Sequence, residues 1–372
     1  MSSGRVLVVA VVAGALAAGA AACGGEDASD PCETGEAGVL CGVVGNGMRA
    51  YNGDGLPAAE TALYLVSRAR HAPDGRLIVV DFNNHMIRRL EADGTVHTIA
   101  GTGVHGFAFD GEPATTSPLE NPIDIDFIPG GDLVFASLHD PRVLTLGADG
   151  IIHAIAGTGL EGSTGDDGDA GVATFAEING LVVTPDGGIV IADSKNNRLR
   201  VLREGRVRAF AGTDEAGYSG DGGDARDARL SYPTAVAVAP DGAVIVADRD
   251  NHAVRRIAPD GTITTVAGTG VRGDSGDGGP AIEAQLDFPD GVAVARDGSI
   301  LIADRANYRV RRVGTDGVIT TIAGSGERGH DGDDGPALAA RFQEIARITL
   351  EPDGSLLIAD QGNSCVRSLV LE

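Results

Sequence analysis

The sequence predicts an all-β protein, a six-bladed β-propeller with four antiparallel strands in each blade. The first observation is a unit that recurs six times, whose central turn falls at residues 74, 130, 186, 241, 297 and 353, a spacing of 55 or 56 residues. The second is that each unit holds four short apolar runs bounded by Asp-Gly or Asn-containing turns, which is typical of strands joined by tight hairpins. Radial repetition of such sheets covers their faces and leaves only short edges.

The clearest unit spans residues 286–326, and its four strands are predicted at GVAVA, SILIAD, YRVRRV and VITTIAG. Each run is β-branched or alternates between apolar and polar residues. The first strand is expected nearest the axis, and a long link follows the fourth. A solenoid is the alternative for any repeat, but four antiparallel strands followed by a long link favour blades.

The start of the chain predicts how the ring closes. VLCGVVGNG at 39–47 matches the end of a unit, such as VITTIAGSG at 318–326, although no unit precedes it. The last unit stops after CVRSLVLE at 365–372 and lacks a fourth strand. We therefore expect residues 39–44 to pair with about 365–370 and to complete the sixth blade, which removes two free edges.

Three segments resemble NHL repeats: IADRANYRVRR at 302–312, VADRDNHAVRRI at 246–257 and VVDFNNHMIRRL at 79–90. The flanking pieces TTVAGTG at 264–270 and GDGGPA at 276–281 are similar to those of bacterial secreted and lipoprotein NHL-repeat proteins. The resemblance covers about residues 37–372 and implies a six-bladed propeller. It also implies a binding platform, although a fold by itself hosts many activities.

Composition excludes two classes of partner. The chain has 53 acidic and 29 basic residues and a formal net charge of -24. Nucleic acid phosphates and anionic lipid surfaces both require a basic surface, so neither is expected as a partner. Cationic ligands, metals or plain solubility remain compatible with this charge.

The first 22 residues are predicted to be a signal peptide, with Arg5 before the apolar stretch VLVVAVVAGALAAGA. Ala20-Ala21-Ala22-Cys23 resembles a bacterial lipobox, which implies a lipid on Cys23, although the usual leucine is Ala20 here. The alternative is simple cleavage after Ala22. Residues 23–36 are expected to form a flexible tether, and 37–372 the propeller. The protein is thus expected to be an exported cell-envelope lipoprotein, at the outer membrane or cell surface, and otherwise secreted; a membrane contact is expected only through the lipid.

Export permits disulfides, and three cysteines follow Cys23: Cys32, Cys41 and Cys365. In the expected register Cys41 and Cys365 lie on adjacent strands, offset diagonally. A bond between Cys32 and Cys41 would instead clip the tether to the closing strand. We favour this second pairing because a short flexible segment can adjust its geometry.

An Asp-Asn-Arg set recurs in five units and is interpreted as structural, because a single active site needs one copy. The aspartate ends the second strand, the asparagine is expected to take the turn conformation, and the arginine returns on the third strand to pair with the aspartate. The sets are Asp81/Asn84/Arg88, Asp193/Asn196/Arg200, Asp248/Asn251/Arg255, Asp304/Asn307/Arg311 and Asp360/Asn363/Arg367.

The sequence offers two kinds of candidate metal site. The GDGG-like links carry clustered carboxylates suited to calcium, but their spacing differs from that of an EF-hand loop. A zinc site would need histidines from different blades to converge, since no two histidines share ligand spacing on one element. We expect no metal or other cofactor, with calcium as the alternative at the six link aspartates, Asp54, Asp110, Asp166, Asp221, Asp277 and Asp333.

Departures from the repeat point to a candidate ligand-binding arc at the central channel. The innermost positions are small or apolar in blades three to five but charged in blades six, one and two, which adjoin once the ring closes. Blade two also has a serine where the repeat has its aspartate. Ion pairing between blades is the alternative interpretation. The arc comprises Arg68, Arg70, Asp124, Asp126, Ser137, His139 and Arg347.

The expected function is a non-catalytic binding module that holds a protein, peptide or glycan on a face or in the channel. No nucleophile elbow is present, and no catalytic residue is assigned. The alternative is a gluconolactonase-like hydrolase with a divalent cation in the channel, for which Asp124, Asp126 and Asn179 are available. A third class, the peptidyl-hydroxyglycine lyases, would require histidine ligands that do not align here.

Overall fold

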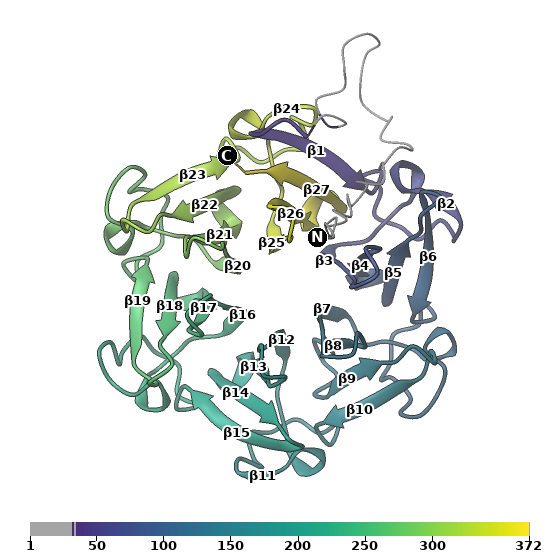
Figure 1. Cartoon of the computed structure of the whole chain (residues 1–372), viewed down its shortest axis with the longest axis horizontal. Helices are drawn as coiled ribbons and strands as arrows, with labels where there is room; N and C mark the ends of the chain where they lie inside the picture. Colours follow the sequence, from purple (N-terminus) through teal and green to yellow (C-terminus); the bar gives the residue numbers. More distant parts are fainter. Residues whose placement is uncertain (1–31, 33–34, 372) are drawn as a thin grey trace, which may run out of the picture.

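Six antiparallel sheets form a closed ring around a central axis in the computed structural model, which describes Cys32 and residues 35–371 (Figure 1). Each sheet is one blade with its first strand nearest the axis, so the six-bladed prediction is confirmed. The predicted signal peptide and Cys23 lie outside the described residues, as does most of the tether. Among the described residues, none of the helices is long and apolar enough to cross a membrane.

The blades follow in chain order, each given from its inner strand to its outer strand. Blade one is β3 (Val66–His71), β4 (Leu77–Asp81), β5 (Met86–Leu90) and β6 (Thr95–Ala100). Blade two is β7 (Pro122–Phe127), β8 (Leu133–Ser137), β9 (Val143–Leu146) and β10 (Ile152–Ala156). Blade three is β12 (Ile178–Val183), β13 (Ile189–Asp193), β14 (Arg198–Arg203) and β15 (Arg206–Ala211).

Blade four is β16 (Pro233–Val238), β17 (Val244–Asp248), β18 (Ala253–Ile257) and β19 (Ile263–Ala267). Blade five is β20 (Pro289–Val294), β21 (Ile300–Asp304), β22 (Arg309–Val313) and β23 (Ile319–Ala323). Blade six is β25 (Ile345–Leu350), β26 (Ser355–Asp360), β27 (Cys365–Val370) and β1 (Val39–Val44). Three sheets carry an extra two-residue strand, namely β2 (Leu56–Pro57), β11 (Gly168–Asp169) and β24 (Gly335–Pro336).

The described helices are 3-10 turns of three residues, and they occur at two places in the repeat. Six lie in the links between blades: η1 (Ala58–Glu60), η3 (Ala114–Thr116), η4 (Ala170–Val172), η6 (Ala225–Asp227), η8 (Ala281–Glu283) and η10 (Ala337–Ala339). Five follow the second strand: η2 (Phe82–Asn84), η5 (Ser194–Asn196), η7 (Arg249–Asn251), η9 (Arg305–Asn307) and η11 (Gln361–Asn363). Blade two lacks this second turn, and it is the blade whose sequence departs from the repeat there.

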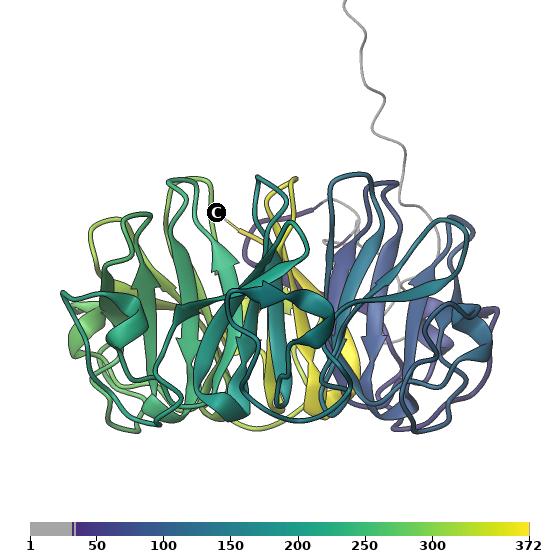
Figure 2. The same ribbon diagram turned by 90° about the horizontal axis from the view of Figure 1, so that it is seen from below.

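The ring has two different faces. The hairpins between first and second strands, and between third and fourth strands, form the hairpin face, whose tight turns stand along one rim in Figure 2. The turns after the second strands and the links between blades lie on the opposite side, the link face. The core lies between neighbouring blades; for example, Ile78 and Val80 of blade one pack with Ile125 and Phe135 of blade two.

The N-terminal strand closes the ring as predicted. β1 pairs antiparallel with β27, with Leu40 opposite Leu369 and Val44 opposite Val366, and the purple and yellow strands lie side by side in Figure 1. Leu40 is fully buried in the core shared by blades five and six. The two ends of the described chain therefore form one sheet.

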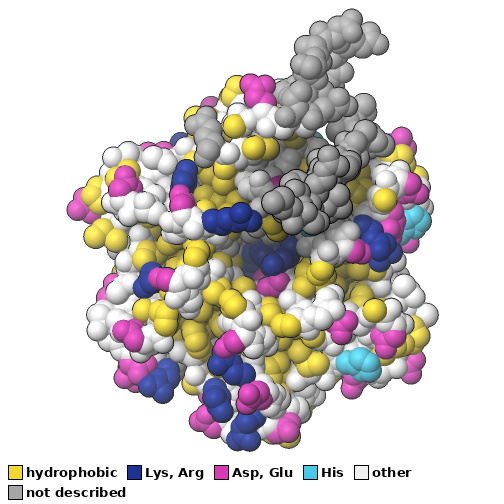
Figure 3. Space-filling model, in the orientation of Figure 1, with side chains coloured by type: hydrophobic (Ala, Val, Ile, Leu, Met, Phe, Trp, Pro, Cys, Tyr) yellow, Lys and Arg dark blue, Asp and Glu magenta, His cyan; other side chains and the backbone are white. Residues whose placement is uncertain are grey.

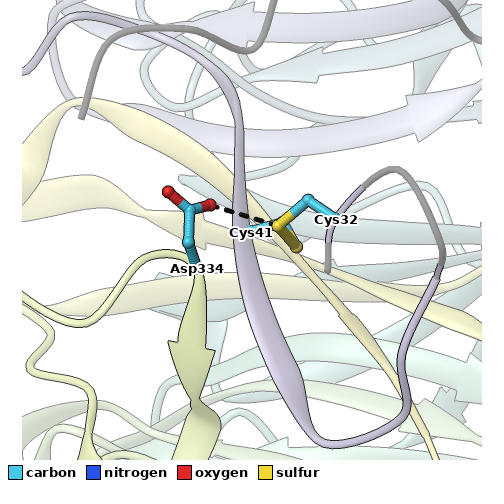
Figure 4. A group of neighbouring side chains, drawn as sticks. All are labelled: Cys32, Cys41 and Asp334. Atoms are coloured by element: carbon cyan, nitrogen blue, oxygen red, sulfur yellow. Dashed lines mark hydrogen bonds between the residues drawn. A yellow bond between two sulfur atoms is a disulfide. The ribbon is translucent and has the colours of Figure 1, made fainter. Parts of the chain in front are cut away.

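A disulfide joins Cys32 to Cys41, the pairing favoured from the sequence (Figure 4). Its sulfur atoms are close to a carboxylate, with Asp334 Oδ1 3.2 Å from Cys32 Sγ. Because both sulfurs are bonded to each other, they do not offer thiolate ligands to a metal. Cys365 is a buried free thiol, and burial raises its pKa.

Candidate ligand-binding site

The recurring Asp-Asn-Arg sets form buried ion pairs, as expected. In blade one, Asp81 accepts hydrogen bonds from the Tyr64 main-chain N–H at 2.7 Å, from Asn84 Nδ2 at 2.9 Å and from Arg88 Nη1 at 3.4 Å. Burial raises the pKa of Asp81 to about 6, against the opposing effect of these donors. The same pairing recurs in four other blades, as Arg200–Asp193, Arg255–Asp248, Arg311–Asp304 and Arg367–Asp360.

The asparagine lies in the turn after the second strand, as predicted, but it does not itself take the left-handed conformation. The next residue does so, and in blade one His85 has φ 54°. Asn84 lies within η2, where its side chain also donates to the Ala50 main-chain oxygen at 2.7 Å. The asparagine thus ties its own blade to the preceding link. Blade two, with Ser137 in the place of the aspartate, pairs Arg142 with Asp140 at 2.6 Å.

The link aspartates serve as second partners of the same arginines. Arg88 Nη2 lies 2.9 Å from Asp54 Oδ1, and the arrangement recurs as Arg200–Asp166, Arg255–Asp221, Arg311–Asp277 and Arg367–Asp333. In blade two, Asp110 faces His153 instead. Because five of these carboxylates each face a guanidinium group, the geometry favours a structural role over a calcium site.

Near the axis, the charged residues of blades one and two pair across the gap between blades. Arg68 Nε lies 3.4 Å from Asp124 Oδ1, and Arg70 Nη1 lies 2.7 Å from Asp126 Oδ1. Both aspartates also accept hydrogen bonds from main-chain N–H groups of β12. On the face drawn in Figure 3, basic and acidic side chains gather in the central hollow, with hydrophobic side chains around them. The arc therefore contains ion pairs between blades, as the alternative interpretation of these charges predicts. Its role in binding a ligand stays a prediction.

Arg347 crosses the axis and joins opposite sides of the ring. Its Nη2 donates to the main-chain oxygen of Asn179 in blade three at 2.7 Å. Its Nη1 donates to the main-chain oxygen of Asp290 in blade five and lies 3.1 Å from Asp290 Oδ1. The residue is 2% exposed. The guanidinium group is thus a fixed part of the packing at the axis.

The glycines at the inner strands of blades three and five have a steric cause. Gly180 and Gly291 lie on inner strands β12 and β20, where the next blade packs against the backbone. A Cβ atom on Gly291 would lie 2.7 Å from the Ala346 main-chain oxygen, and one on Gly180 would collide with the Thr234 main-chain oxygen. The next blade therefore leaves no room for a side chain at either position.

A cavity of about 290 Å³ opens where the inner strands begin, on the link face. Its wall is apolar at Leu65, Phe82, Ile123, Leu138 and Ala346. Its charged lining consists of Arg249, Arg305, Arg347, Asp290 and Glu344. A concave site that combines an apolar wall with convergent charged groups can hold a small ligand.

Asp290 is the acidic centre of this cavity. Burial opposes its charge, but the guanidinium groups of Arg347, Arg305 and Arg249 outweigh that effect and lower the pKa of Asp290 to about 2. Arg305 Nη1 lies 2.8 Å from Asp290 Oδ2, and Arg305 Nη2 lies 3.1 Å from Glu344 Oε2. Arg305 and Arg347 are therefore committed to carboxylates of the protein.

Arg249 differs from these two arginines. Its guanidinium group stacks on Tyr232 and Phe288, 5.3 and 5.2 Å from the ring centroids. Its nearest carboxylate partner is Asp250 at 3.7 Å, and its buried Nε has no hydrogen-bond partner in the described part of the chain. The guanidinium group is thus held in place by the two rings, and it has hydrogen-bond donors that no described residue accepts. Tyr232 is fixed by a 2.9 Å bond to Glu177, and burial raises its pKa to about 12.

The residues predicted for the arc fall into separate places. Arg347 lines the cavity, while Arg68 pairs with Asp124 and Arg70 with Asp126 in the channel. Ser137 is buried, and its Oγ has no partner among the described residues. His139 lies next to the cavity residue Leu138 and contacts Glu120 instead.

Sequence reasoning missed Arg249, Arg305 and Asp290. The two arginines take the position directly after the repeat aspartate, which is Phe82, Leu138, Ser194 and Gln361 in the other blades. Asp290 takes the second position of the inner strand, which is Ser67, Ile123, Asn179, Thr234 and Ala346 elsewhere. A comparison of these two repeat positions would have found all three, because they carry charge in one or two blades only.

Family models match three parts of the chain. The model described as the teneurin NHL domain matches residues 259–330. The NHL repeat model matches residues 175–202 and 230–257.

Curated relatives are similar over most of this chain. The protein SUPPRESSOR OF QUENCHING 1, chloroplastic, of Arabidopsis thaliana is 29% identical over 276 residues, which cover 68% of this chain and 26% of the relative. Teneurin-m of Drosophila melanogaster is 28% identical over 347 residues, which cover 85% of this chain and 12% of the relative. The chain thus spans about a quarter or less of these relatives.

Solved structures share the fold. A protein of unknown function from Bacteroides thetaiotaomicron has a TM-score of 0.67 and 18% identity, covering 90% of this chain and 76% of its own. An auxiliary nutrient binding protein from the same species has a TM-score of 0.65 and 15% identity, covering 88% and 75%. A gluconolactonase from Xanthomonas campestris has a TM-score of 0.56 and 15% identity, covering 83% and 87%. The chain is thus a six-bladed β-propeller, and three parts of its sequence match NHL-repeat models.

Proposed function

We propose that the protein is an exported binding module whose central cavity on the link face holds a ligand with a carboxylate group. The observation that carries this proposal is Arg249, a guanidinium group clamped by two aromatic rings at the cavity with unused hydrogen-bond donors. A planar guanidinium group binds a carboxylate through two parallel hydrogen bonds. Preorganisation lowers the entropy cost of making those bonds.

The charge of the cavity supports an acidic ligand. Three arginines line it against Asp290 and Glu344, although the whole chain has a formal net charge of -24. The apolar wall with Phe82 suits the face of a sugar ring or an aliphatic side chain. A volume of about 290 Å³ suits one such unit. A nutrient-binding role agrees with the likeness to auxiliary nutrient binding proteins.

Export is supported by the Cys32–Cys41 disulfide, because disulfides persist in oxidising compartments. Anchoring through a lipid on Cys23 belongs to the same proposal. The hydrolase alternative is less well supported by the channel, since Asp124 and Asp126 each pair with an arginine. Those guanidinium groups would repel a divalent cation.

Calorimetric titration with trigalacturonate, triglutamate and neutral cellotriose tests the proposal. At least one of the two acids should bind, and cellotriose should bind at least tenfold more weakly. The Arg249→Leu variant should lose at least tenfold in affinity for that acid, the scale of a charge-assisted hydrogen bond. The matched control is Arg296→Leu, because Arg296 is an exposed arginine bonded to the Pro352 main-chain oxygen. Equal affinity for acid and neutral sugar, or no effect of Arg249→Leu, would overturn the proposal.

A further inference from the structure

Three side chains converge between blades one and two, outside the central cavity. Glu120 lies just before β7, His105 lies in the link that follows β6, and His139 lies in the loop after β8. His105 Nε2 is 2.7 Å and His139 Nδ1 is 2.9 Å from the same atom, Glu120 Oε1. Histidines from two separate segments therefore meet at one carboxylate oxygen.

The burial of these groups is uneven. The Glu120 side chain is 3% exposed, whereas those of His105 and His139 are 64% and 49% exposed. Within the described residues, the only ion-pair partners of Glu120 are these two imidazoles. A buried carboxylate normally has a permanent positive partner or a metal ion, because desolvation penalises an unpaired charge. Among the described residues, two imidazole rings take that place.

The repeat shows how unusual this arrangement is. On the opposite side of the ring, Arg272 and Asp287 take the positions of His105 and Glu120, and Ala306 takes that of His139. There Arg272 Nε lies 2.9 Å from Asp287, an ordinary ion pair. Between blades one and two, an imidazole therefore stands where the other site has a guanidinium group. A second imidazole stands where the other site has an alanine.

We propose that Glu120, His105 and His139 bind a divalent transition-metal ion, with zinc the best fit. Two imidazole nitrogens and one carboxylate oxygen form a three-ligand set that zinc takes in proteins, at about 2.0–2.2 Å from each ligand atom. Imidazole also suits copper and nickel, whereas calcium and magnesium prefer oxygen ligands. The nitrogens of His105 and His139 both contact Glu120 Oε1 but are not close enough to each other to share an ion as they stand, so binding requires the exposed His139 ring to turn towards the His105 ring.

His85 acts on this site as a positioning residue. Its Nδ1 accepts a 3.2 Å hydrogen bond from the Asn121 main-chain N–H, so the proton of the neutral ring is on Nε2. That nitrogen therefore has no lone pair for a metal. The His85 ring meets the His105 ring edge to face, with centroids 5.1 Å apart, and so restricts its rotation.

Zinc titration of the tag-free, full-length protein, read by calorimetry and by metal analysis after dialysis, tests the site. One zinc ion should bind per chain with a dissociation constant below about 10 µM, and His105→Ala and His139→Ala should each weaken binding at least tenfold. Bound cobalt should give the intense visible absorption of a tetrahedral site. Glu120→Gln should remove that absorption.

His97→Ala and His153→Ala are the matched controls, because both histidines lie on outer strands away from Glu120. Both controls should bind zinc as the unmodified protein does. Each single variant leaves the other imidazole against the buried Glu120, so the melting temperature should fall only slightly and circular dichroism should show the same fold, which separates loss of the site from loss of the fold. No zinc binding below 1 mM, or unchanged affinity in both His105→Ala and His139→Ala, would overturn the proposal.

Discussion

Arg347 Nη2 lies 2.7 Å from the main-chain oxygen of Asn179, although 168 residues separate the two in the chain. The contact joins blade six to blade three, on opposite sides of the ring. A single buried guanidinium group therefore spans the axis, and it also pairs with Asp290 of blade five. The centre of this propeller is consequently part of its packed core, in addition to forming the wall of a cavity.

Replacing Arg347 by methionine should destabilise the protein by about 3–5 kcal/mol, the range for breaking a buried ion pair from one side. The change removes the Arg347 donor from the main-chain oxygen of Asn179 and leaves that of Asp290 with the Thr234 hydroxyl alone, and it removes one of the cations around the Asp290 carboxylate. Thermal melting checks this, with Arg296→Met as the exposed control. A melting temperature equal to that of the control would show that the contact across the axis contributes nothing.

Replacing Gly180 by alanine should destabilise the fold by about 1–3 kcal/mol, as for an overpacked core. The added Cβ would overlap the Thr234 main-chain oxygen, so blades three and four would have to separate. Gly42→Ala is the matched control, because its Cβ would meet only the Asp333 side chain at an ordinary 3.6 Å. Chemical denaturation of the two variants measures the difference. Equal stability would mean that the inner strands can move apart at little cost.

The blades and their closure could be predicted from the sequence because they depend on local patterns that recur six times. Residues 39–44 repeat the outer-strand pattern, and the last unit lacks that strand, so pairing of 39–44 with about 365–370 could be predicted; the structure adds the register, with Leu40 opposite Leu369. The charged inner positions were also visible as departures from the repeat. Whether Arg68 and Asp124 are paired or free depends on the distance between two blades, which no single repeat encodes.

The cavity and the histidine cluster could not be predicted in the same way. Arg249 is a candidate only because Tyr232 and Phe288 stack on it, and both come from other segments of the chain. His105 and His139 are 34 residues apart and flank different strands. Their approach to Glu120 is set by the path of the link between blades, where turns and irregular backbone leave no periodic signal.

Replacing Leu40 by alanine should weaken ring closure and destabilise the protein by about 2–5 kcal/mol. Leu40 is fully buried on β1 and packs with Phe342 and Leu369, so its loss leaves a cavity in the sheet that joins the two ends of the chain. Leu338→Ala is the control, because Leu338 is 58% exposed. Thermal melting should separate the two variants clearly. Equal melting temperatures would show that β1 adds little to the stability of the ring.

The stabilising effect of His71 should depend on pH. Its Nδ1 lies 3.3 Å from Glu351 Oε2, and this hydrogen bond raises the pKa of His71 above its ordinary value of 6.5. The folded protein therefore holds this proton more tightly than the unfolded chain does. The resulting stabilisation is fully present below pH 6.5 and is lost as the pH rises through the raised pKa.

The His71→Gln variant should accordingly lose stability relative to the unmodified protein at pH 6, and the difference should shrink by pH 8.5. The change with pH should be at most about 1 kcal/mol, because the His71 side chain is 35% exposed and solvent screens the pair. Denaturation at both pH values measures it, with His97→Gln on the outer strand β6 as the control. If the difference between variant and unmodified protein stayed constant from pH 6 to pH 8.5, Glu351 would not be stabilising the protonated ring.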